Sequence, residues 1–120
     1  GETPVEPVQP GTNRAALEAE VDVLAHPGFI TEEEARLAAS KNILLELSGR
    51  KGHSLTNGHV ARMAQRFGAP LAINADAHAP GDFLTAEMAE KVGLGAGLDA
   101  AGYEQVRRNM AELVERIKEL

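Results

Sequence analysis

Two segments of the chain place metal-binding side chains directly after a mainly apolar run. Asp76 and His78 follow residues 71–73, and His26 follows residues 21–25. Side chains alternate along a strand, so a carboxylate and an imidazole two residues apart project to one side of a strand end. Hard oxygen and imidazole nitrogen ligands together suit Zn, Mn or Fe. These three residues are therefore the predicted ligands of a metal centre.

Structural roles for the same residues stay open at this point. His26 precedes Pro27 and Gly28, and its ring could hydrogen-bond a loop carbonyl instead of a metal. Asp76 stands where a strand gives way to a loop, a position at which Asp commonly stabilises a turn. The pairing of Asp76 with His78, together with the second strand-end histidine, favours the metal interpretation.

The composition is that of an ordinary globular domain with an aliphatic core. The 120 residues are 43% hydrophobic and 25% charged, but only 3% aromatic, so Ala, Leu, Val and Ile must build the core. The absence of cysteine excludes thiolate metal sites and disulfides. A net charge of -6 argues against a nucleic-acid backbone as partner. The sequence shows neither a membrane span nor a signal peptide, which predicts a cytoplasmic protein.

The elements expected to position the candidate residues alternate between helix and strand. A capping box at Thr31 and Glu34 marks one helix start, Gly68 marks a helix end, and Asp99 can cap the last helix. Residues 1–12, with several prolines, and residues 48–58 are expected to be loops. The predicted order is helix 13–20, strand 21–25, helix 31–41, strand 43–47, helix 59–67, strand 71–74, helix 85–92 and helix 99–120, with a glycine-spaced turn at 93–97.

Strands that are continuous apolar runs and alternate with helices are typical of a parallel sheet covered by helices. In such α/β folds, sites gather at the carboxyl ends of the strands. His26, the segment 48–53 and the segment 76–78 each come directly after a predicted strand. Their common placement predicts one active site.

With these motifs in place, the chain resembles the PHP (polymerase and histidinol phosphatase) superfamily of metal-dependent phosphoesterases, and most of all its histidinol-phosphatase-like members. The resemblance covers nearly the whole chain from Val5 onward. The order of a strand-end His, then Gly-Arg-Lys-Gly, then Asp-x-His is the specific part of the match. The matching stretches are VDVLAHPGFIT, LLELSGRKGHSLTNGHV and LAINADAHAPGDFLT.

The resemblance implies a fold and a cofactor. Members of the family have a distorted (β/α)7 barrel, like a TIM barrel short of one unit, and the chain would be part of it. Their metal centre holds two or three divalent ions of Zn, Mn or Fe, drawn from several strand ends. By this resemblance His26, Asp76 and His78 would be metal ligands in a cytoplasmic hydrolase that acts on a small phosphorylated substrate.

The resemblance also implies roles for the loop after the second strand. Arg50 matches a phosphate-binding arginine, and Lys51 would assist it, since Arg binds phosphate as a bidentate fork and Lys as a point charge. His53 would be the catalytic residue that protonates the leaving alcohol, because imidazole titrates near neutral pH. A solvated basic turn is the alternative interpretation of Arg50 and Lys51.

The departure from the family pattern concerns the N-terminal half. The His-x-His pair, further histidines and a bridging Glu of the family do not occur in residues 1–120. The chain is therefore interpreted as the C-terminal part of a single PHP domain. A missing N-terminal half, or self-association, is expected to complete the barrel and cover its open strand edges. The chain by itself is expected to be catalytically poor or inactive.

Two other functions compete with the phosphoesterase. A non-catalytic PHP-like scaffold should have lost the ligand positions and gained a basic face, whereas this chain keeps His26, Asp76 and His78 and is acidic. An accessory PHP domain of a nucleic-acid enzyme would need an attached module that these residues do not contain. A nucleic acid is expected only as a phosphoester substrate.

Overall fold

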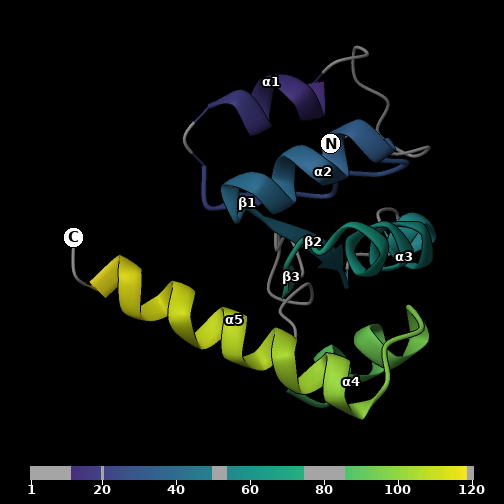
Figure 1. Ribbon diagram of the computed structural model, residues 1–120. Coiled ribbons are helices and arrows are strands. Elements are labelled where there is room, and N and C mark those ends of the chain that lie inside the picture. The colour runs from purple at the N-terminus through teal and green to yellow at the C-terminus, as the bar shows by residue number, and fades with distance from the viewer. Residues whose placement is uncertain (1–11, 20, 50–53, 75–85, 119–120) are drawn as a thin grey trace.

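The computed structural model describes residues 12–19, 21–49, 54–74 and 86–118 of the chain (Figure 1). Its centre is a three-stranded sheet in the order β1-β2-β3, and both strand pairs are parallel. The strands are β1 (Val23–Leu24), β2 (Leu44–Ser48) and β3 (Leu71–Asn74). The predicted α/β class with a parallel sheet is confirmed.

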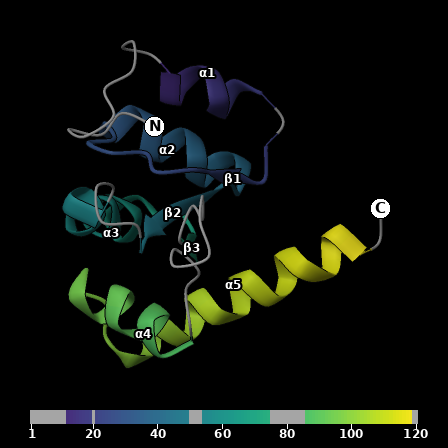
Figure 2. The same ribbon diagram turned by 180° about the vertical axis from the view of Figure 1, so that it is seen from behind.

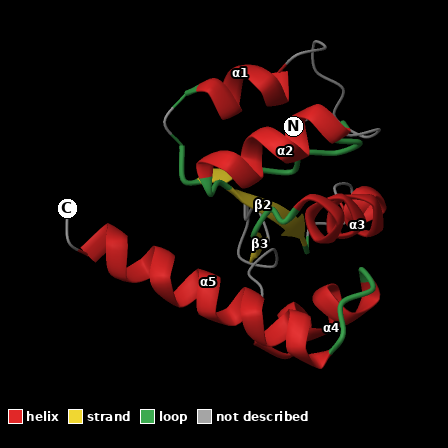
Figure 3. Cartoon of the chain, in the orientation of Figure 1, coloured by secondary structure: helices red, strands yellow, loops and turns green. Residues whose placement is uncertain are grey.

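Helices separate and surround the strands, so β1–α2–β2 and β2–α3–β3 form consecutive βαβ units. In Figures 1 and 2, α1 and α2 lie toward the β1 edge of the sheet and α4 and α5 toward the β3 edge. Figure 3 shows that most of the described residues belong to helices and few to strands. The helices are α1 (Thr12–Glu18), α2 (Glu32–Lys41), the 3-10 turn η1 (Ser54–Thr56), α3 (Asn57–Phe67), α4 (Ala86–Gly95) and α5 (Ala100–Lys118).

The hydrophobic core covers one face of the sheet. Leu45 and Leu47 of β2 are fully buried in it, together with side chains from α1, α2, α3 and α5. Because side chains alternate along a strand, Glu46 and Ser48 lie on the opposite face. Ala72 pairs with Glu46 in register and is also buried outside the core cluster. The sheet thus has an apolar face and a second buried face that carries polar groups.

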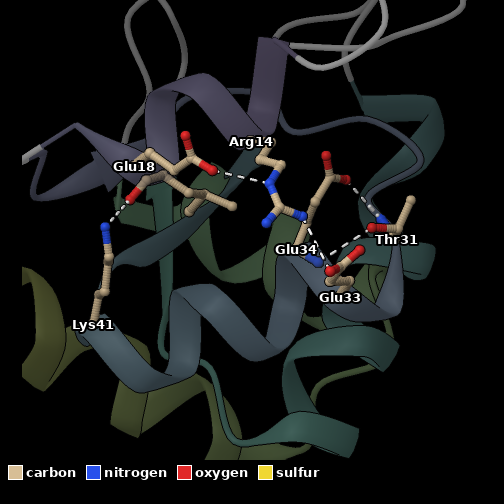
Figure 4. Close-up of polar contacts among 7 residues, drawn as sticks. Arg14, Glu18, Thr31, Glu33, Glu34 and Lys41 are labelled. Carbon is tan, nitrogen blue, oxygen red and sulfur yellow. Dashed lines mark hydrogen bonds and ion pairs between the residues drawn. The ribbon is translucent and has the colours of Figure 1, made fainter.

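Polar contacts fix α1 against α2 (Figure 4). Arg14 lies 2.9 Å from Glu18 on its own helix and 3.1 Å from Glu33 on α2. These carboxylates, Glu33 first, raise the pKa of Arg14. Lys41, at the end of α2, donates to the carbonyl of Leu17 at 2.7 Å. Leu17 is fully buried, so the α1–α2 pair has an apolar anchor with polar contacts around it.

The element predictions were accurate where periodicity and caps agreed. The capping box of α2 is present, Gly68 ends α3 in the left-handed region with φ 79°, and the carboxylate of Asp99 accepts the Gly102 amide at 2.7 Å. The strand predicted at 71–74 matches β3.

Other boundaries were wrong. The first strand was predicted over five residues but β1 spans only Val23–Leu24, and α3 begins at Asn57, before the predicted start at residue 59. In the short first helix the sequence predicts Ala15, Ala16 and Ala19 as the contacts. Ala16 packs against the core as expected, but Ala15 and Ala19 are exposed, and the helix buries Leu17 and Asn13 instead.

The apolar stripe of α5 is only partly covered. Val106 is buried and Met110 packs against the core, whereas Val114 is 47% exposed. Asn109 of the same helix donates to the carbonyl of Leu71 at 3.0 Å, which joins α5 to β3. Within the described residues, none of the helices combines the length and hydrophobicity that a membrane span requires.

The capping box gives a first test of the fold. Thr31→Ala removes the side-chain acceptor of the Glu34 amide, at 3.2 Å, and is expected to lower the free energy of unfolding by about 1 kcal/mol. Urea denaturation followed by circular dichroism measures the change. Ser40→Ala, which removes an exposed hydroxyl bonded to the Leu37 carbonyl, should cost about 0.5 kcal/mol or less. Equal effects of the two variants would contradict a role for the capping box.

Candidate metal centre

His26 is the one predicted ligand that the described residues include. It follows β1 closely, at the carboxyl end of the sheet, and its side chain is half-buried. Its backbone has φ 28°. A positive φ is uncommon for residues other than glycine and persists only where the surroundings impose it. The conformation of His26 therefore depends on specific contacts of the turn that it begins.

A carboxylate of the middle strand makes one of these contacts. The backbone N–H of His26 donates to Oε1 of Glu46 at 2.9 Å. Glu46 is 3% exposed, on the sheet face opposite the hydrophobic core. Because Glu46 alternates with Leu45 and Leu47 along β2, it faces away from the helix-covered core, toward the turn of His26.

An amide from α1 makes the next contact. Asn13 Nδ2 donates to the carbonyl of Pro27 at 2.6 Å, and the Asn13 side chain is fully buried. A buried amide without such a bond would cost stability, so this bond favours one placement of the turn. Through it, the helix before β1 fixes the Pro27–Gly28 peptide of the turn that His26 begins.

A second histidine supports the end of the same segment. His59 of α3 has its Nε2 2.7 Å from the carbonyl of Ile30. Its ring packs edge-on against Phe29, with centroids 5.6 Å apart. Binding a loop carbonyl was the structural alternative for His26, and His59 has that role in this fold. The segment 26–30 is thus held by α1, β2 and α3.

The carboxyl end of β2 is held by a paired amide. Asn57, the first residue of α3, accepts the Ser48 N–H at 2.9 Å and donates to the Ser48 carbonyl at 2.9 Å. Both residues are buried. The two bonds fix the strand end from which the chain enters the segment with the predicted phosphate-binding residues.

The remaining predicted site residues lie outside the described residues. They are Arg50, Lys51, His53, Asp76 and His78. In the sequence they come shortly after β2 and β3, as His26 comes after β1. Among the described residues alone, no group of three or more His, Asp or Glu side chains lies close enough to hold a metal ion.

Asp22 lies apart from this edge. It precedes β1, at the amino end of the strand, and its carboxylate is 3.5 Å from Arg116 of α5. From the sequence alone, Asp22 and Asn74 could each orient metal ligands, but the position of Asp22 at the amino end of β1 does not support that role. Its contact instead joins α5 to the start of the sheet.

Several residues of this edge were not singled out by sequence patterns. Asn13 stands in a short helix whose alanines were the expected contacts, and Asn57 was assigned to a loop. Asn57 does not cap α3, because Thr56 precedes the helix and the Asn57 side chain bonds the Ser48 backbone instead. The partner of that Asn could not be read from the sequence, because the contact spans a loop.

Comparison with known proteins gives one relative and no functional description. The chain is 47% identical over 119 residues to an uncharacterized protein of Methanocaldococcus jannaschii. The match covers 98% of this chain and 55% of that protein, so the chain spans about half the length of the relative. No family model matches the chain. No solved structure matches it either.

Proposed function

We propose that this chain supplies part of the active site of a metal-dependent phosphoesterase of the PHP type. The observation that carries the proposal is the parallel sheet in which β2 lies between β1 and β3 and pairs with both. Parallel neighbours end at one edge, so residues that follow their carboxyl ends converge there. His26, the Arg50 segment and the Asp76 segment follow these strands in turn.

We also propose that the sheet is a portion of a distorted (β/α)7 barrel. Two features of the strands support this fold. Helices and the apolar core cover one sheet face, as on the outside of a barrel, and the other face carries Glu46, Ser48 and the small Ala72. The remaining strands would come from a further segment of the protein or from another copy; a relative about twice as long agrees with the first source.

The donor set suits a divalent metal ion. The candidate ligands His26, Asp76 and His78 offer nitrogen and oxygen, which fits Zn, Mn or Fe. The half-buried ring of His26 stands at the strand-end edge, on a turn held by buried contacts. Bound ions would supply an activated water and neutralise charge on the phosphoryl oxygens.

The other side chains would bind and orient the substrate. Arg50 would bind two phosphoryl oxygens through its planar fork, with Lys51 as an additional positive charge. His53 would donate a proton to the leaving alcohol. Asn57 fixes the strand end that leads into this segment, and so limits where these groups can stand.

Metal content per chain, measured by elemental mass spectrometry after dialysis against Zn, Mn and Fe, tests the proposal. The wild-type chain is expected to retain one weakly bound ion. The Asp76→Ala/His78→Ala variant should lose it, whereas Glu87→Ala/Glu90→Ala, which removes exposed carboxylates of α4, should retain it. No metal on the folded wild-type chain, or equal metal on all three proteins, would sink the proposal for this chain.

A further inference from the structure

We propose that Glu46 is a positioning residue, which holds His26 in the orientation needed to bind its ligand. The inference rests on the proposed function in that the ligand is a divalent metal ion. Glu46 comes from the middle strand and His26 from the turn after the neighbouring strand. Their contact, the His26 N–H to Glu46 Oε1 at 2.9 Å, joins the middle of β2 to the turn that follows β1.

The backbone of His26 explains why such a contact is needed. With φ 28°, His26 lies outside the broad regions that residues with a Cβ prefer. Since φ rotates the Cα–Cβ bond relative to the preceding peptide, its value decides from which direction the imidazole leaves the backbone. A contact that fixes the His26 amide therefore also fixes the direction of its Cα–Cβ bond, and so limits where the ring can lie.

The chemistry of Glu46 suits this role. A carboxylate accepts hydrogen bonds and a backbone amide donates them, so in this contact Glu46 is always the acceptor and His26 the donor. Charge-assisted bonds of this kind are roughly twice as strong as neutral ones. A carboxylate that is 3% exposed is also costly to bury without hydrogen-bond donors. Breaking the contact between Glu46 and the His26 amide would therefore cost free energy.

The position of Glu46 agrees with its chemistry. It stands between Leu45 and Leu47, whose side chains fill the core on the other face. An apolar residue at this position could fill the space but could not accept the His26 amide. The bond to Pro27 from Asn13 at 2.6 Å holds the next peptide of the turn, so His26 is fixed from both sides.

The test compares Glu46→Ala with Glu46→Gln, which keeps an acceptor oxygen of the same reach. Zn²⁺ affinity is measured by competition with a chromophoric chelator, and the backbone of His26 is followed by NMR through its amide resonance and its intraresidue amide–α NOE. Glu46→Ala is expected to weaken Zn²⁺ binding by about ten- to a hundredfold and to abolish the positive φ. Glu46→Gln should restore both to near wild type.

Two further variants separate positioning from general loss of stability. Thr31→Ala weakens the start of α2 without touching His26, and should leave Zn²⁺ affinity unchanged. If Glu46→Ala does not fold, Glu46→Asp, in which the carboxylate is drawn back by one methylene, provides the same comparison with the charge retained.

The outcomes are distinguishable. A wild-type affinity in Glu46→Ala, an unchanged φ, or a Gln variant as weak as the Ala variant would overturn the role of Glu46 while leaving the metal site intact. A wild-type chain whose Zn²⁺ binding does not depend on His26, Asp76 or His78 would instead overturn the proposed function, and with it the purpose assigned to Glu46.

Discussion

Leu47→Ala is expected to lower the free energy of unfolding by about 2–5 kcal/mol. Leu47 is fully buried in β2, between the neighbouring strands and the core cluster. Replacement removes apolar contacts and leaves a cavity that the paired middle strand cannot close by moving. Because small domains have about 5–15 kcal/mol in total, this one change would remove a large share of the stability. Urea denaturation of wild type and variant measures it.

An exposed leucine provides the matched control. Leu55 is 69% exposed in η1, so Leu55→Ala makes the same chemical change with an expected effect of about 0.5 kcal/mol or less. A loss below about 1 kcal/mol in Leu47→Ala, or equal losses in the two variants, would contradict the placement of Leu47 in the centre of the core. The urea m-values should be equal, since the surface exposed on unfolding hardly changes.

Sequence patterns predicted the class of the fold because local signals carried it. Periodicity placed α2, α3 and β3, and the predicted end signals act where expected: Thr31 caps the start of α2, Gly68 ends α3 and Asp99 caps the start of α5. Strand length was not encoded locally. β1 pairs over only Val23↔Leu44 and Leu24↔Leu45, and this extent depends on the register with β2, which no residue of the first strand specifies.

The glycines after residue 92 show a different failure. A turn was predicted from Gly93 onward, but α4 continues to Gly95. Gly93 is buried, and a Cβ at this position would stand 3.0 Å from Cδ1 of Tyr103. The glycine permits a close approach of α4 to α5 instead of ending the helix. Glycine for a turn and glycine for close packing look the same in a sequence, because the partner is remote.

The candidate site likewise has features that local sequence signals predict and contacts between remote residues that they do not. The strand-end position of His26 could be predicted, because it depends on where an apolar run stops. Asp76 and His78 lie outside the described residues, and the role of all three as ligands stays a prediction. The groups that hold His26 could not be predicted. Asn13 and Glu46 lie 14 and 20 positions away from their partners in the sequence. Contacts of this kind leave no periodic signal, since each depends on one pair of atoms brought together by the fold.

Buried polar contacts therefore hold the start of two loops at the candidate site. Glu46 and Asn13 hold the turn after β1, and Asn57 holds the end of β2. Binding sites need groups fixed more precisely than a loop alone provides, and buried hydrogen bonds to the backbone supply that precision. Loss of the contact at β2 should consequently affect both stability and the local order of the strand end.

Asn57→Ala is expected to cost about 2–4 kcal/mol, because it removes both bonds to the Ser48 backbone at once and each buried group left unsatisfied costs about 1–3 kcal/mol. The amide of Asn57 accepts from Ser48 N–H and donates to Ser48 carbonyl, both at 2.9 Å. Denaturation gives the loss of stability, and hydrogen exchange of the Ser48 amide reports the strand end directly. That amide should exchange much faster in the variant than in wild type.

Asn109→Ala is the matched control, since half-buried Asn109 also bonds a strand carbonyl, that of Leu71 at 3.0 Å, while its other bond, accepted from Gln105 at 3.0 Å, is an exposed one within α5. Its loss is expected to cost about 1 kcal/mol and to leave the exchange of the Ser48 amide unchanged. Asn57→Asp tests the donated bond separately. The carboxylate still accepts the Ser48 N–H but repels the Ser48 carbonyl, so the free energy of unfolding should stay below that of wild type. Equal stability of the Asn57 and Asn109 variants, with protection of Ser48 retained, would show that the paired amide does not hold the end of β2.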